Sequence, residues 1–422
     1  MRWGKRLPVH YGRDDVRGRN SPGGVHVTEQ LARPRLTPWR AIAAFGVVSL
    51  AADMVYEGAR SITGPLLATL GASALAVGLI TGTGEAAALL LRLVSGPLAD
   101  RTARYWALTI TGYGLTAVCV PLLALTPALG AAGLAVAAAL IVTERIGKAI
   151  RSPAKSTLLA EAAGAVGRGR GFAVHKALDQ IGAFAGPLLV AALVALAGTV
   201  WPALAVLAVP GAVAMVLLVW MRRRFPGPAP RPDAPVSAAA GPLPRRFYWF
   251  AAAAAASTAG LVTFGLISYH ASRTGGIPLA AVPVLYAGAM AAGAVAALAS
   301  GYLYDRWGAR VLYALPVLAA GTPALALSGS VTAIVAGTLL WGAAVGVQDS
   351  TVKALVADLV PGSRRATAYG VFAAIQGVAA IAGGALAGGL YDYSITLLAV
   401  VLAGTQVIAL LLLVMTGPDP AQ

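Results

Sequence analysis

Charged residues and cysteine are both scarce in this sequence. Only 11% of the 422 residues are charged, 58% are apolar, and the mean hydropathy is +0.76. So few charges cannot cover a water-soluble domain of this length, and a single cysteine, Cys119, cannot build a disulfide framework. The composition therefore excludes a soluble enzyme, a disordered chain and a secreted disulfide-rich domain. We expect an all-α integral membrane protein.

The sequence also lacks the short alternating segments of a transmembrane barrel and any phosphate-binding loop. Its apolar stretches run for about twenty residues, the length that a helix needs to cross the bilayer. They predict about twelve spans, near residues 40–62, 74–99, 106–125, 130–150, 172–197, 201–221, 247–270, 281–300, 311–328, 331–350, 367–390 and 395–415. Without a phosphate loop, ATP is not expected as the direct energy source, and we expect no cofactor.

Acidic residues are half as numerous as basic ones, with 16 Asp and Glu against 32 Lys and Arg. The basic residues gather in the head, around a middle linker and in alternate loops, whereas the opposite loops carry little beyond Arg273. This is the positive-inside distribution, so the net charge of +16 reports topology and not nucleic-acid binding. It predicts a multi-pass protein of the cell inner (plasma) membrane, with both termini cytoplasmic. We also expect a monomer.

The spans divide into two six-helix halves. Between them lies a segment with too many prolines to form a helix. We expect a disordered cytoplasmic head, a first bundle, a cytoplasmic linker, a second bundle and a cytoplasmic tail, at residues 1–39, 40–221, 222–246, 247–415 and 416–422.

The two halves share a motif that follows the second span of each. The sequences GPLADRTAR, from Gly96 to Arg104, and GYLYDRWGAR, from Gly301 to Arg310, both fit GxLxDR. Further along, matching residues recur at a constant offset of 197, as in Gly186 and Gly383. A parallel duplication explains both observations. Across residues 40–415 the chain resembles the major facilitator superfamily, whose loop signature these motifs match.

The resemblance implies two pseudo-symmetric bundles, alternating access and energy from an ion gradient. In that family the loop aspartate is a latch that caps a helix of the opposite half, and a carboxylate at a helix N-terminus is stabilised by the helix dipole. The corresponding residues here are Gly96, Asp100, Arg101, Arg104, Gly301, Asp305, Arg306 and Arg310. The first copy has Ala103 where glycine is usual, which leaves its turn geometry open. A solvated loop that only ends the helix is the alternative.

Charged side chains inside the spans lie nearly all in the first half, and each costs about 2.5 to 3.5 kcal/mol unless it is paired or hydrated. Helical spacing places them on common faces of the first, second, fourth and fifth spans. We expect proton coupling from Asp53, Glu57, Glu85, Asp179, Glu144 and His175. A charge network or an anion-binding role is expected for Arg60, Arg92, Arg145, Lys148, Arg151 and Lys176.

Three of the carboxyl groups, Asp53, Glu85 and Asp179, are expected near the bilayer midplane. Low-dielectric surroundings favour the protonated form of a carboxyl group, so such groups can take up and release a proton. The alternative is a set of fixed ion pairs that hold the bundle together. His175 has no second His or Cys nearby on its helix, so we expect no metal site.

The fifth span contains Gly182, Gly186 and Pro187 in the pattern GxxxGP, which resembles a motif of proton antiporters. Arg145 resembles the arginine that this family carries in its fourth span and associates with proton transfer. Ordinary packing of small residues between helices is the alternative for the glycines.

The second half is nearly uncharged within its spans. Its polar and aromatic candidates are expected to form a cavity wall, and they are Tyr269, Tyr286, Trp341, Gln348, Asp349 and Gln376. Titratable groups facing an apolar wall suit an amphiphilic organic molecule. We interpret the chain as a proton-coupled exporter of such a molecule and not as an enzyme. Proton-coupled uptake of an organic anion, with Arg60, Arg92 and Arg145 as counter-ions, and a non-transporting receptor or scaffold are the alternatives.

Overall fold

The structure is a computed structural model that describes residues 36–164, 166–225, 242–274, 276–361 and 364–416. Contacts divide the chain into residues 1–35 and a compact unit from Leu36 onward, and everything below concerns the second unit. The expectations for residues 1–35, for most of the linker and for residues 417–422 lie outside the described residues.

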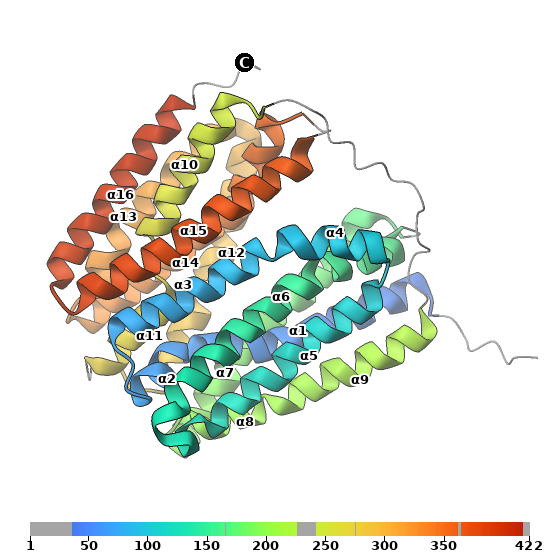
Figure 1. The fold of residues 1–422 in the computed structure, drawn as a ribbon, viewed down its shortest axis with the longest axis horizontal. Coiled ribbons are helices and arrows are strands. Elements are labelled where there is room, and N and C mark those ends of the chain that lie inside the picture. Colours follow the sequence, from blue (N-terminus) through green and yellow to red (C-terminus); the bar gives the residue numbers. More distant parts are fainter. Residues whose placement is uncertain (1–35, 165, 226–241, 275, 362–363, 417–422) are drawn as a thin grey trace, which may run out of the picture. The chain divides into compact units, whose positions relative to one another are not determined.

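The described residues form helices and no strands, as expected of an all-α membrane protein (Figure 1). The first half contains α1 (Pro38–Ser61), α2 (Thr63–Thr69), α3 (Ala74–Leu90), α4 (Arg92–Thr102), α5 (Tyr105–Leu122), the 3-10 helix η1 (Leu123–Ala132), α6 (Gly133–Ala163), α7 (Arg168–Ala197), α8 (Trp201–Val206) and α9 (Ala208–Arg224). The second half contains α10 (Arg245–Gly260), α11 (Phe264–Arg273), α12 (Ala281–Trp307), the 3-10 helix η2 (Gly308–Tyr313), α13 (Ala314–Ala326), α14 (Val331–Leu359), α15 (Arg365–Tyr391) and α16 (Ile395–Met415).

Ten helical stretches of the described chain are long and apolar enough to cross a membrane. Two of them, Tyr105–Ala163 with 59 residues and Ala281–Ala326 with 46, each contain a 3-10 segment. The expected count of twelve stays a prediction.

The helix that contains the fourth predicted span is longer than that span, because α6 continues from residue 150 to Ala163. Pro153 lies inside this helix and cannot donate to the carbonyl of Ala149 four residues earlier. The hydroxyl of Ser95 in α4 donates to that carbonyl instead, at 2.8 Å. A proline is tolerated within a span when a neighbouring helix supplies the missing hydrogen bond.

The buried apolar side chains form one core shared by both halves and two cores that each belong to one half. The shared core includes Leu66 of α2 and Leu266 of α11. The other two lie toward the predicted cytoplasmic end, around Phe45 in the first half and around Phe247 in the second. We call the shared group the outer core, because it lies toward the end opposite the predicted cytoplasmic one.

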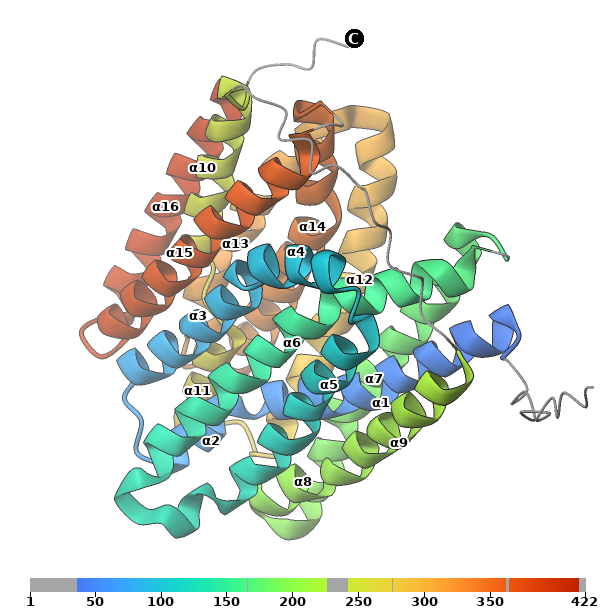
Figure 2. The same ribbon diagram turned by 45° about the vertical axis from the view of Figure 1, so that its right-hand side comes forward.

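Close backbone contacts confirm that the halves are packed together at the outer end. A Cβ atom on Gly64 of α2 would overlap the backbone of Gly265 and Tyr269 in α11. A Cβ on Gly78 of α3 would likewise overlap the carbonyl of Gly384 in α15, and α3 and α15 lie side by side in both views (Figures 1 and 2). The halves are therefore closed against each other at the outer end.

The internal repeat is visible in the packing of equivalent helices. Gly186 of α7 lets that helix approach the backbone of Met54 in α1, and Gly383 of α15 approaches the backbone of Ala259 in α10 in the same way. The two glycines are the pair that the sequence relates at an offset of 197.

Candidate functional site

Two groups of polar side chains lie around successive turns of helix α1, and each includes residues of neighbouring helices. We call the group at Asp53 the Asp53 cluster, and its members are Ser49, Asp53, Tyr113, Lys155, His175, Lys176 and Asp179. We call the other the Tyr56 cluster, and its members are Tyr56, Glu57, Arg60, Glu85, Arg92, Thr116, Glu144, Arg145, Lys148 and Arg151. The predicted midplane carboxyl groups are therefore divided, because Glu85 lies in the Tyr56 cluster.

The Asp53 cluster is built where α7 packs on α1. The carboxyl groups of Asp53 and Asp179 lie within hydrogen-bonding distance of each other. Lys176 Nζ is 2.6 Å from Asp179 Oδ2, although its own side chain is 67% exposed. Lys155 of α6 lies within electrostatic range of both aspartates. The carboxyl pair thus has a cation on each side.

His175 belongs to the Asp53 cluster through Ser49. The Ser49 hydroxyl is 2.8 Å from His175 Nε2 and 3.2 Å from the hydroxyl of Tyr113, and Lys155 Nζ donates to it at 3.2 Å. His175 is buried, and no group of three or more His, Cys, Asp or Glu residues in the described chain is arranged to hold a metal ion. The arrangement links a buried imidazole to the carboxyl pair through hydroxyl and ammonium groups.

Tyr56 is the centre of the second cluster. The Arg60 and Arg145 guanidinium carbons lie 6.0 and 4.4 Å from its ring centroid, and Lys148 Nζ lies 3.9 Å from it. Arg145 also donates to the Tyr56 hydroxyl. Cations over an aromatic face are attracted by its quadrupole, so one buried tyrosine holds cations from α1 and α6 together.

Two carboxylates pair with these cations. Glu85 Oε1 of α3 is 2.8 Å from Arg60 and 3.8 Å from Arg145. The buried Glu144 lies 3.6 Å from Arg145 and 3.9 Å from Arg151, and it accepts a hydrogen bond from Thr116 at 3.0 Å. Helical spacing predicts that Glu144, Lys148 and Arg151 share one face of the fourth span. In the structure this face is divided, because Glu144 and Arg151 face α5 whereas Lys148 faces Tyr56.

The Tyr56 cluster is partly exposed at its edge. The side chain of Glu85 within α3 is 33% exposed, and that of Arg60 in the last turn of α1 is 25% exposed. Across from them, Asp349 of α14 is exposed and lies within electrostatic range of Arg60 and Arg92. These side chains are placed where a polar solute between the halves would meet them.

Three polar contacts join the halves near the outer end. The Tyr286 hydroxyl of α12 donates to Glu57 Oε2 of α1. The Tyr269 hydroxyl donates to the Ala72 carbonyl at 3.1 Å, and the hydroxyls of Thr81 and Thr263 are 3.0 Å apart. One of the predicted coupling carboxylates is therefore part of the closure between the halves.

The candidates for the cavity wall fall into two groups. Tyr269, Tyr286 and Trp341 are buried in the outer core, where the Trp341 indole donates to the carbonyl of Val262 at 2.8 Å. That carbonyl lies in the break between α10 and α11, where the helix leaves it without an internal partner. A structural contact thus occupies Trp341 in this conformation, and its role in a cavity wall stays a prediction.

The amide candidates meet at Thr258 of α10. Gln376 accepts a hydrogen bond from the Thr258 hydroxyl, and Gln348 Nε2 donates to it at 3.2 Å. Gln376 Nε2 is buried without a partner among the described residues. These amides and Asp349 are the polar groups that the second half presents.

The two GxLxDR loops differ in sequence but share one backbone feature. Ala103 has φ +49° and Gly308, at the equivalent place, has φ +59°. Asp100 accepts a hydrogen bond from Tyr105 of its own half at 3.5 Å, and no ion pair in the described residues involves Asp100 or Asp305. The role of these loops as a latch stays a prediction.

Gly182 and Gly186 serve as packing residues. A Cβ on Gly182 would lie 2.7 Å from Leu50 Cα, and one on Gly186 would lie 2.7 Å from Met54 Cα. Both glycines, with Pro187 next along α7, hold that helix close to α1 and so bring Asp179 to Asp53. This geometry gives the motif a structural role, whereas a role in antiport stays a prediction.

The sequence interpretation missed several members of the clusters. These are Ser49, Tyr56, Tyr113, Thr116 and Lys155. Helical spacing contains a signal for two of them, because Ser49 lies four residues before Asp53 and Lys155 four residues after Arg151. Lys155 was overlooked because the span was expected to end at residue 150.

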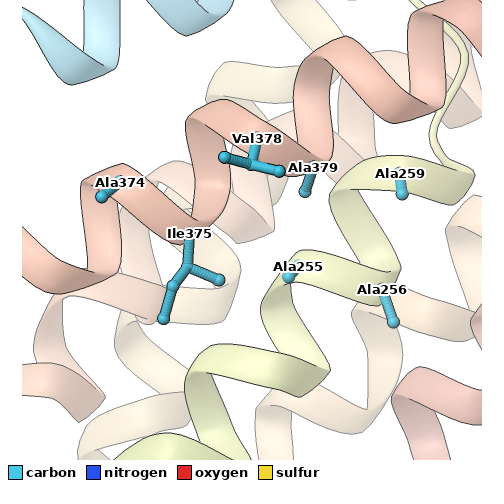
Figure 3. Close-up of a pocket in the computed structure, with 7 residues that line it drawn as sticks. All are labelled: Ala255, Ala256, Ala259, Ala374, Ile375, Val378 and Ala379. Carbon is cyan, nitrogen blue, oxygen red and sulfur yellow. The ribbon is translucent and has the colours of Figure 1, made fainter.

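An apolar crevice of about 550 Å³ lies apart from both clusters, between α10 and α15 (Figure 3). Its lining consists of Ala255, Ala256, Ala259, Ala374, Ile375, Val378 and Ala379. These side chains offer neither a charge nor a hydrogen bond. The chemistry of this protein is therefore argued from the two clusters.

Comparison with known proteins gives a family and close relatives. The family model of the Major Facilitator Superfamily matches residues 45–327 and 248–422. Uncharacterized proteins of Mycobacterium tuberculosis (strain ATCC 25618 / H37Rv) and Mycobacterium bovis (strain ATCC BAA-935 / AF2122/97) are 55% identical over 388 residues, which cover 90% of this chain and 94% of each relative.

Solved structures with a similar fold are distant in sequence. A variant of the nucleoside transporter NupG has a TM-score of 0.74 at 14% identity and covers 90% of this chain and 100% of its own. A POT family transporter in complex with a thioalcohol-conjugated peptide has a TM-score of 0.72 at 12% identity, with 91% and 97% covered. An inward-facing bacterial homolog of the human lysosomal transporter Spinster has a TM-score of 0.62 at 16% identity, with 90% and 95% covered.

Proposed function

Because the chain belongs to the major facilitator superfamily and is a multi-pass membrane transporter of that type, we propose that it exports a small amphiphilic organic molecule in exchange for protons. Transport occurs by alternating access, with the outer end and the predicted cytoplasmic end opening in turn. The observation that carries the proton-coupled part is the carboxyl pair of Asp53 and Asp179 inside the first half.

Two carboxyl groups at hydrogen-bonding distance repel each other when both are ionised, so such a pair retains one proton more readily than two separate groups do. Lys155 and Lys176 stabilise the charge that remains after the proton leaves. His175 and Ser49 offer a hydrogen-bonded route beside the pair. The pair is thus suited to hold a proton in one conformation and release it in the other.

The Tyr56 cluster supplies the polar side of the substrate site, and the Thr258 amides supply hydrogen bonds from the second half. Coupling requires that a bound proton lowers the affinity for the substrate and that a bound substrate lowers the affinity for the proton. Helix α1 carries residues of both clusters, so a shift of this one helix reaches both sites.

A second candidate is proton-coupled uptake of an organic anion. The observation that favours it is the excess of cations over carboxylates in the Tyr56 cluster. In this mechanism the proton and the anion enter together, and the cations are the counter-ions.

Proteoliposomes test direction and coupling together. Compounds that stabilise the purified protein in a thermal-shift screen are loaded into proteoliposomes. These vesicles contain a pH-sensitive dye, and a pH gradient is imposed across their membrane. Export by exchange requires substrate and protons to move in opposite directions, whereas co-entry establishes the symport alternative. A gradient that moves none of the stabilising compounds contradicts both transport proposals and favours a receptor or scaffold.

Variants then test the carboxyl pair. Asp53→Asn and Asp179→Asn should each abolish gradient-driven transport and retain the folded protein, and the double variant with Glu57→Gln tests whether Glu57 substitutes for Asp53. Glu161→Gln, an exposed carboxylate near the end of α6 outside both clusters, is the matched control and should transport normally. Normal accumulation by both aspartate variants and by the double variant contradicts the role of the pair.

A further inference from the structure

The Tyr56 cluster carries a specific ligand chemistry. We propose that it binds an oxyanion, a carboxylate or phosphate group on the transported organic molecule. This inference rests on the proposed transport function, because it names the class of substrate for the same site. It applies equally to export and to uptake.

The first argument is charge balance. The Tyr56 cluster contains the cations Arg60, Arg92, Arg145, Lys148 and Arg151 and the carboxylates Glu57, Glu85 and Glu144. Cations outnumber carboxylates by two, and the exposed Asp349 across from them supplies one further negative charge. The Asp53 cluster, in contrast, sets two lysines against two aspartates.

The second argument is that the carboxylates are already engaged. Glu85 pairs with Arg60, Glu144 pairs with Arg151, and Glu57 accepts from Tyr286. Lys148 forms no salt bridge with any described residue, although Glu57 and Glu85 lie within its electrostatic range, and its Nζ lies on the ring of Tyr56. An unpaired charge away from bulk water is costly, and a bound anion removes that cost.

Arg92 supports the same conclusion from α4. Its Nε is buried and has no hydrogen-bond partner among the described residues. It lies within electrostatic range of Glu85 and also of Arg151, another cation. A guanidinium in this position retains donors for an oxygen that the protein does not supply.

The third argument is geometry. Arg60 of α1 and Arg145 and Lys148 of α6 converge on the one ring of Tyr56, so donors from two helices share a centre. Guanidinium and ammonium groups in this arrangement match the oxygens of a carboxylate or a phosphate. The exposed fractions of Arg60 and Glu85 show that solvent reaches the edge of this centre, whereas Tyr56 itself is buried. A cationic ligand would add to the excess of positive charge in the Tyr56 cluster, and a neutral ligand would leave that excess unchanged.

Four probes that share a phenyl ring test the proposal by thermal unfolding of the full chain in detergent. They are benzoate, phenyl phosphate, benzamide and benzylamine, titrated to millimolar concentrations at constant ionic strength. We expect one or both anions to raise the melting temperature and the amide and amine not to do so. The better of benzoate and phenyl phosphate identifies carboxylate or phosphate as the recognised group. Equal stabilisation by benzamide or benzylamine, or none by either anion, overturns the proposal.

Lys148→Met provides the matched variant, and Arg222→Met, an exposed cation in the last turn of α9 outside both clusters, is its control. The loss of a charged donor should weaken the apparent Kd of the stabilising anion roughly ten- to a hundredfold in Lys148→Met. In Arg222→Met the Kd should stay within about twofold of the parent value. An unchanged Kd in Lys148→Met overturns the assignment.

A measurement without ligand separates binding from a structural role. Because Lys148 forms no salt bridge with a described residue, Lys148→Met should melt at the same temperature as the parent or higher. A clear fall in melting temperature would show that the ammonium is structural and would overturn the proposal. None of these experiments uses a gradient, so anion binding without proton-linked flux contradicts the proposed function alone, and flux without anion binding contradicts this inference alone.

Discussion

The hydrogen bond from Tyr286 to Glu57 joins the two halves, and its removal should shift the balance between conformations. Tyr286→Phe deletes one hydroxyl group and nothing else. The ring contacts remain, because the ring packs against Phe264 at 4.5 Å and against Trp341 at 6.4 Å between centroids. The bond exists only while the outer end is closed, so its loss should favour the conformation that opens there.

A hydrogen bond to an ionised acceptor contributes about 1.5 to 3 kcal/mol. At 1.4 kcal/mol for each factor of ten, the ratio of outer-open to outer-closed protein should rise roughly ten- to a hundredfold. Glu57 remains within electrostatic range of Arg60 and Lys148 in the variant, because the substitution moves neither cation. The shift therefore reports the bond between the halves.

Distances between spin labels at the outer end measure this ratio. Leu129 in η1 and Val331 at the start of α14 are exposed and lie in different halves, and Cys119→Ser removes the one native cysteine. Tyr391→Phe is the control, because its hydroxyl lies 2.7 Å from His270 Nδ1 within the second half. Tyr286→Phe should gain a population at longer distance, and Tyr391→Phe should not. Identical distributions for Tyr286→Phe and the parent would refute the reasoning.

Three further predictions concern backbone and loops. Ala103→Gly should stabilise the protein by about 1 kcal/mol, because an L-residue with positive φ is strained. Ala139→Gly, in the second turn of α6, should instead destabilise it by about 0.5 to 1 kcal/mol. A lower melting temperature for Ala103→Gly would contradict this reasoning. Gly186→Ala should reduce the melting temperature and the yield of folded protein, because the added Cβ meets the backbone of α1. The added Cβ of Gly404→Ala meets nothing within 4 Å, so this variant should be tolerated. Equal behaviour of the two variants would show that α1 and α7 separate freely. Asp100→Asn should leave the thermal stability of the outer-closed protein unchanged but weaken closure at the predicted cytoplasmic end. The same label experiment should then show a smaller outer-open population. An equal or larger outer-open population would mean that the loop is merely structural.

The fold was predictable from sequence because the bilayer limits it so strongly. A chain with long apolar runs must form helices there, since no other open structure satisfies the backbone groups. Helix boundaries were less accessible. The continuation of α6 through Pro153 depends on a hydroxyl from Ser95, and local sequence around the proline contains no sign of that contact.

The candidate site was predictable in composition but not in grouping. Helical spacing placed the charged residues on common faces, yet it could not say which faces meet. Asp53 pairs with Asp179 because two glycines bring α7 against α1, and Glu85 is drawn to Arg60. Tyr56 was not predicted as a site residue, because a tyrosine in an apolar helix is typical of the hydrophobic core. Only the cations that converge on its ring in the structure show that it lies at the centre of the cluster.

The outer core has a consequence for how the conformational equilibrium responds to solution conditions. One end of the protein is closed chiefly by apolar packing, whereas the predicted latch at the other end depends on charge. Hydration of apolar surface has a large heat capacity, so opening the outer end should depend on temperature with marked curvature. Contacts between exposed charges are instead weakened by dissolved salt. Temperature and ionic strength thus act on opposite ends of the same molecule, and together they are independent controls over which end is open.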